Sequence, residues 1–133
     1  MIRQQFDIED YYKVIVYYSV DFNLFDIIVQ DLVAADAPSK LIWEMYDMLF
    51  SQQAKAVTFS NIEEHISIVL FNEHKNKEDY INSIVHEAEH VKQAMLKAYD
   101  VEDEGEVPAY TIGYLISQMY RVFSQLICDY SCP

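Results

Sequence analysis

"AVTFSNIEEHISIVLFN", residues 56–72, contains the clearest strand pattern of the sequence. Two runs rich in β-branched and aromatic residues, Val57–Ser60 and Ile66–Phe71, flank the polar segment NIEEH, a pattern that predicts a β-hairpin. A further run of the same kind, "YYKVIVYYSV" at residues 11–20, predicts a strand nearer the N-terminus. We therefore expect a small β-sheet.

The segments between and after these strands predict four helices. Apolar residues recur at helical spacing over residues 21–36, behind an Asp cap, and a second helix should run from Pro38 to about Gln52. Asn76 should cap a long helix that ends near Tyr99, and a last helix should run from about Val107 to Asp129. The order β-α-α-β-β-α-α predicts an α+β fold with a small antiparallel or mixed sheet, in a single domain over residues 1–133.

Charge and composition exclude several classes of function. The net charge of −13 disfavours nucleic acid or an anionic membrane as a partner. No apolar window reaches the ~18 residues that span a bilayer, and the N-terminus lacks the apolar run of a signal peptide. We expect a soluble, cytoplasmic protein. Cys128 and Cys132 do not have a usual zinc spacing and are expected to be reduced thiols.

The long helix contains the motif HEAEH, residues 86–90. His86 and His90 lie one turn apart on one face, so both imidazoles can reach the same metal ion. Glu87 projects about 100° away, close enough to the open position of such an ion to act as a general base. The motif predicts a zinc site with two histidine ligands and Glu87 as a catalytic residue.

A solvated helix face is the competing interpretation of the same motif. The helical wheel puts the histidines on a polar side, opposite a stripe of apolar residues that should face the core: Ile81, Ile84, Val85, Ala88, Val91 and Met95. A catalytic helix would have the same pattern if its apolar side packed on a sheet and its polar side faced a cleft.

A third metal ligand is expected near the start of the last helix. Its apolar seam, projected back by one turn, reaches Glu106, and a carboxylate on a buried stripe needs a partner such as a metal. Pro108 disfavours helical geometry at the residue before it, which leaves other acids open as the ligand: Asp100, Glu102, Asp103 and Glu104. Tyr110, four residues after Glu106, either donates to a reacting oxygen or belongs to the core.

H-E-x-x-H followed by G-E-x-x-A-Y, here at residues 86–90 and 105–110, resembles small gluzincin-like zinc metallopeptidases of bacteriophages and mobile elements in Bacteroidetes. The matching stretch runs from Val57 to Leu115, nearly half of the chain. The resemblance implies a minimal zincin-like fold, with Zn²⁺ held by His86, His90 and Glu106 and with Glu87 as the base. It implies hydrolysis of a peptide or protein substrate and does not name that substrate.

Two other functions fit the sequence: a catalytically inactive, metal-binding relative of the zincins, and an acidic interaction or inhibitor protein that mimics nucleic acid. The strand Ile66–Phe71 is either the sheet edge on which a peptide is laid or a central strand of the core. His65 and His74 are expected to be solvated loop histidines.

Overall fold

The computed structural model describes residues 1–131 of the chain, and the side chains of residues 1–126. Its centre is a mixed sheet of four strands, β1 (Ile2–Ile8), β2 (Tyr12–Tyr18), β3 (Ala56–Asn61) and β4 (Ile66–Phe71). They lie in the order β1-β2-β4-β3, with β2 and β4 parallel and the two outer pairs antiparallel. The predicted α+β class with a small mixed sheet is confirmed.

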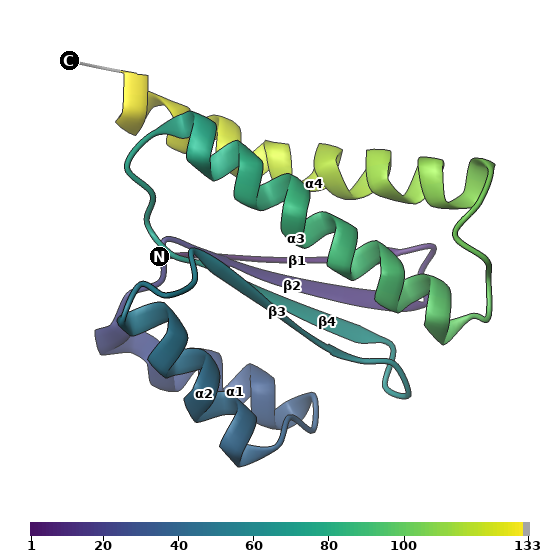
Figure 1. Ribbon diagram of the computed structural model, residues 1–133, viewed down its shortest axis with the longest axis horizontal. Coiled ribbons are helices and arrows are strands. Elements are labelled where there is room, and N and C mark those ends of the chain that lie inside the picture. The colour runs from purple at the N-terminus through teal and green to yellow at the C-terminus, as the bar shows by residue number, and fades with distance from the viewer. Residues whose placement is uncertain (132–133) are drawn as a thin grey trace.

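Helices cover both faces of this sheet (Figure 1). A 3-10 turn, η1 (Phe22–Leu24), leads into α1 (Phe25–Ala34) and α2 (Ser39–Phe50), which lie on one face. The other face carries α3 (Lys77–Ala98) and α4 (Glu106–Ser131). Within the described residues, every helix is too short or too polar to cross a membrane.

Strand β2 explains why the sheet needs two helical layers. Val14, Val16 and Tyr18 pack into the core beneath α3 and α4, whereas Ile15 and Tyr17 pack into the core beneath α1 and α2. Because successive side chains of a strand point to opposite faces, a continuous apolar run leaves both faces in need of cover.

Strand β1 occupies a segment for which the sequence pattern predicted no strand, so the observed order is β-β-α-α-β-β-α-α. Ile2, Phe6 and Ile8 pack toward the α3–α4 layer, and Gln4 interrupts their apolar alternation. The Gln4 side chain donates to a backbone carbonyl of α4 at 2.7 Å and accepts from the Tyr18 hydroxyl at 2.7 Å. These hydrogen bonds satisfy a polar residue at an inward position. The sequence therefore lacks the continuous apolar alternation that would have predicted this strand.

The predicted hairpin is present as β3 and β4. The sequence left open whether β4 is a sheet edge that binds a peptide or a central core strand. All six residues of β4 are buried, because β4 lies between β2 and β3 with helices on both faces. It is therefore a central core strand. The free edge on this side of the sheet belongs to β3, which is only partly buried.

Candidate metal centre

Helix α3 begins where the sequence predicted. The Asn76 side-chain oxygen accepts a hydrogen bond from the backbone N–H of Asp79 at 2.9 Å, which makes Asn76 the N-cap. Just before it, the His74 ring bridges the Asn72 carbonyl oxygen and the Ser83 hydroxyl, each at 2.7 Å. We call this arrangement the His74 clasp, because it joins the end of β4 to the second turn of α3.

The solvated-loop prediction for His74 is wrong, because the side chain is only 7% exposed. A carbonyl oxygen can only accept, so Nδ1 carries the ring proton and Nε2 accepts from the hydroxyl of Ser83. Burial lowers the pKa of His74 below its ordinary value, and the hydrogen bond to Asn72 opposes that shift. The ring is therefore a neutral, structural element of the clasp.

The buried face of α3 is rotated from the one that the helical wheel predicted. Ile84, Ala88, Val91 and Met95 are buried as expected, but Ile81 and Val85 are exposed. Polar residues of the helix take their place in the interior: Ser83, Glu87 and Lys92. The reason is that α3 contacts β3, β4 and α4 together, so its buried face extends beyond the apolar stripe.

His86 and His90 converge at the surface of this helix. Their Nε2 atoms are 3.2 Å apart, and the rings meet edge to face with centroids 4.9 Å apart. Both side chains are exposed, so an ion or a substrate could reach them from solvent. Without a metal, one ring nitrogen donates to the other, which is the competing explanation of the short distance.

Glu87 lies beside the two histidines and is turned inward. It is 4% exposed, and Thr58 Oγ1 on β3 donates a hydrogen bond to its Oε2 at 3.2 Å. Burial raises the pKa of the Glu87 carboxyl, and the charges of His90 and His86 and the Thr58 hydrogen bond oppose that shift. One ligand atom from each of these three residues lies within 4.8 Å of the others, which is a spacing that a metal ion could bridge.

A groove of about 650 Å³ opens over these residues. Residues of α3 that include His86, Glu87 and His90 form one wall, β3 from Ala56 to Ser60 forms the base, and α2 forms the far wall. The free edge of the sheet thus runs beside the imidazole pair.

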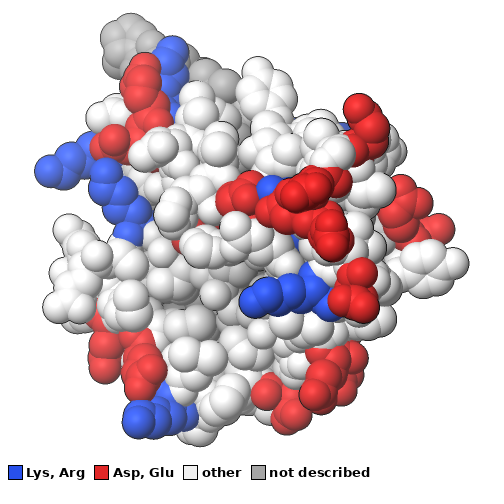
Figure 2. Space-filling view, turned by 45° about the vertical axis from the view of Figure 1, so that its right-hand side comes forward, with Lys and Arg blue, Asp and Glu red and all other residues white. Residues whose placement is uncertain are grey.

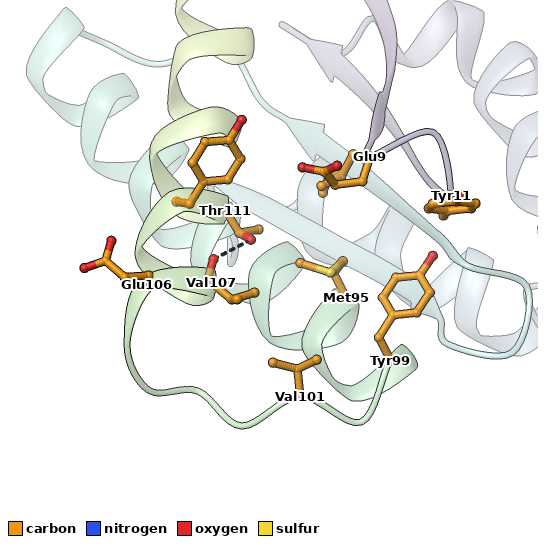
Figure 3. A pocket seen from close by; sticks show the side chains of 10 residues that line it. Glu9, Tyr11, Met95, Tyr99, Val101, Glu106, Val107 and Thr111 are labelled. Carbon is orange, nitrogen blue, oxygen red and sulfur yellow. Dashed lines mark hydrogen bonds between the residues drawn. The ribbon is translucent and has the colours of Figure 1, made fainter.

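Glu106 and Tyr110 do not lie with the histidines. Both line a second pocket, at the C-terminal end of α3. This pocket shares no lining residue with the groove. Figure 3 shows Glu106 at the start of α4 with its carboxylate directed away from Met95 and Tyr99. The metal-ligand group of the described residues also contains none of the neighbouring acids that were the alternative ligands.

The seam of α4 explains this placement. Its buried positions run through Thr111, Leu115, Met119 and Phe123, whereas the residues predicted on the seam near its start, Ala109 and Gly113, are exposed. Projecting the observed seam backward does not reach Glu106, which is exposed. The prediction that Glu106 is a buried carboxylate is therefore wrong, and burial gives no reason to place a metal beside it.

The remaining predicted groups lie apart from the centre. His65, half-buried at the hairpin turn, accepts or donates a hydrogen bond at Nδ1 with the Tyr99 hydroxyl at 3.2 Å. Cys128 and Cys132, the predicted reduced thiols, lie outside the described side chains.

Comparison of the chain with protein-family models, with curated proteins and with solved structures gives no match. The likeness to gluzincins therefore depends on the HEAEH and GEVPAY motifs of the sequence alone.

Proposed function

We propose that the protein is a zinc-dependent hydrolase of peptide bonds, in which His86 and His90 bind the ion. The observation that supports this most is the 3.2 Å distance between their Nε2 atoms. Two imidazoles on a tetrahedral zinc ion, with Zn–N bonds of about 2 Å, hold their nitrogens about 3.3 Å apart. The pair thus has the separation of two zinc ligands before any ion binds.

When bound, zinc would supply Lewis acidity that polarises a carbonyl group and acidifies water. The protein would supply the base. Thr58 donates to Oε2 of Glu87, and an oxygen of this carboxylate lies within 4.8 Å of the imidazole nitrogens, where it could take a proton. The hydrogen bond across to β3 also fixes the carboxylate relative to the groove, and a fixed base reacts with less reorganisation than a mobile one.

An extended peptide is the substrate that the groove fits best. The edge strand β3 can accept a further strand, because the outer side of an edge strand offers unpaired backbone N–H and C=O groups. A peptide paired there would pass alongside His86 and His90. This relation of helix, edge strand and groove supports the proposal of a minimal zincin-like domain.

Zinc would have two imidazole ligands here, with its other positions open to water and substrate. Catalytic zinc sites commonly have three protein ligands, so we expect weaker binding than at a complete site. Glu106 could serve as the third ligand only if the start of α4 moved from its present pocket.

The test combines zinc binding with hydrolysis of a quenched-fluorescence peptide library. We expect wild-type protein loaded with zinc to cleave the library, and Glu87→Gln to retain zinc and lose cleavage. Thr58→Val should keep zinc and cleave more slowly, because the base is no longer held. Zinc binding without any cleavage would support the inactive, metal-binding alternative and reject the hydrolase.

A further inference from the structure

The second pocket, which we call the tyrosine pocket, has a volume of about 540 Å³ and lies where four segments meet. The β1–β2 turn, the end of α3, the loop after it and the first turns of α4 each contribute to the lining. Its walls are largely apolar and aromatic, from Tyr11, Met95, Tyr99, Val101, Val107 and Tyr110. In Figure 3, Met95, Tyr99, Val101 and Val107 form one group below the β1–β2 turn, which carries Glu9 and Tyr11.

Exposed apolar side chains are concentrated here. Five of the lining residues are among the large hydrophobic residues that the folded chain leaves in solvent: Tyr11, Tyr99, Val101, Val107 and Tyr110. Scattered surface hydrophobics need no explanation, but a contiguous set around a concavity marks an interaction site. Such a set is also costly to leave in water, so its burial would favour binding.

The rim of the tyrosine pocket is acidic on both sides. Glu9 and Asp10 lie in the β1–β2 turn, and Glu102, Glu104 and Glu106 lie in the α3–α4 loop and at the start of α4. Figure 3 places Glu9 and Glu106 on opposite sides of Val107. In Figure 2, where this end of the molecule comes forward, Asp and Glu side chains gather around uncharged surface.

Few cations balance this rim. Two cations of α3 lie near this end of the helix, Lys92 and Lys97. Lys92 already pairs with Glu89 at 2.7 Å and with Asp103 at 3.0 Å, and Lys97 lines the groove and not the tyrosine pocket. The lining itself contains acids and no Lys, Arg or His. Among the described residues, neither Glu9 nor Glu106 has an ion pair, so both carboxylates are available to a partner's cations.

We propose that the tyrosine pocket binds a basic segment of a partner protein, with apolar side chains in the pocket and flanking Lys or Arg side chains on the acidic rim. We choose a basic segment because its positive charges complement the acidic rim of the pocket. A second copy of this chain would bring the same acidic rim, and a single small ammonium ion could not reach carboxylates on both sides at once. A segment with several cations can.

This proposal does not depend on the proposed hydrolase. The tyrosine pocket and the groove share no lining residue, and binding is measured without zinc. The probe is a fluorescein-labelled peptide with a central Leu-Phe block flanked on each side by lysines. Two control peptides replace the lysines with glutamates or the Leu-Phe block with serines. We expect saturable binding, by fluorescence anisotropy, of the first peptide alone.

Two variants with matched controls locate the binding. Tyr110→Ala should weaken it by about tenfold, because truncation of a central aromatic residue removes a binding hot spot. Tyr120→Ala, on the same helix and similarly exposed at 56% against 65%, should leave it unchanged. Glu106→Lys should weaken it by a similar factor, whereas Glu78→Lys, an exposed acid in the first turn of α3, should not.

Circular dichroism melting confirms that each variant is folded, which these exposed positions should allow. The proposal is overturned if the lysine-flanked peptide does not bind. Equal losses in each variant and its control would also overturn it, because they would reveal attraction to the overall negative charge and no selective site.

Discussion

Replacement of Ser83 with alanine would test the His74 clasp, which joins the sheet to the helix that carries the metal-binding motif. The change removes the hydroxyl that donates to His74 Nε2 at 2.7 Å. Both residues are buried, so water cannot readily take the place of that donor. The acceptor nitrogen is left unsatisfied, and the backbone hydrogen bond on the other side of the ring remains.

The expected cost follows from these contacts. An unsatisfied buried acceptor costs about 1–3 kcal/mol, and the better helix propensity of alanine returns about 0.5 kcal/mol. The net loss in the free energy of unfolding is about 0.5–2.5 kcal/mol. For 133 residues the entropy of unfolding is about 0.28 kcal/mol/K, so Tm should fall by about 2–9 °C.

The measurement is thermal unfolding followed by circular dichroism, with urea unfolding at 25 °C for the free energy. Ser117→Ala is the control, because Ser117 is exposed on α4 and donates to a carbonyl of its own helix at 2.7 Å. That variant gains helix propensity without leaving a buried group unpaired, so its Tm should stay the same or rise. Equal Tm values for the two variants would refute the structural role of the clasp.

Three further predictions concern charge, ligands and packing. His74 has a lowered pKa, so the unfolded chain takes up a proton first; its contribution to stability is present above a pH of about 6.5 and is lost as the pH falls through the folded pKa. Urea unfolding at pH 7.5 and 5 should show a larger loss for wild type than for His74→Gln, and equal losses would contradict the assignment. Glu106→Gln should leave zinc affinity within about twofold, whereas His90→Ala should lower it by more than about tenfold, both by calorimetry. Val85, which is 49% exposed, should tolerate serine within about 0.5 kcal/mol by urea unfolding, whereas the buried Val91 should lose about 2 kcal/mol or more on change to alanine.

The parts of the fold that local chemistry determines were predictable from the sequence. The hairpin, the positions of the four helices and the cap at Asn76 follow from β-branched runs, helical spacing and a side chain that satisfies a backbone N–H. The parallel pairing of β2 with β4 was not predictable, because it joins segments separated by α1, α2 and β3. Strand β1 was missed because Gln4 is satisfied only by contacts from other elements.

Only the part of the candidate site that lies within one helix was predictable from the sequence. His86 and His90 meet because four residues make about one helical turn, and this spacing needs no tertiary information. The position of Glu106 depends on how α4 is rotated against α3, and an error in that rotation moves a residue from the seam to the surface. A seam drawn through Thr111 and Leu115 would have avoided the error, but Thr111 is polar and was not counted as part of it.

Zinc titration into metal-stripped protein, followed by calorimetry, measures whether His86 and His90 form a metal site. We expect one zinc ion per chain for wild type and for His65→Ala, in which a histidine outside the centre is removed. His86→Ala should lose this binding. A wild-type protein that takes up no zinc at micromolar concentration, or a His86→Ala variant that binds as wild type does, would rule out the proposed metal site. The two imidazoles would then be a hydrogen-bonded pair on the surface of a helix.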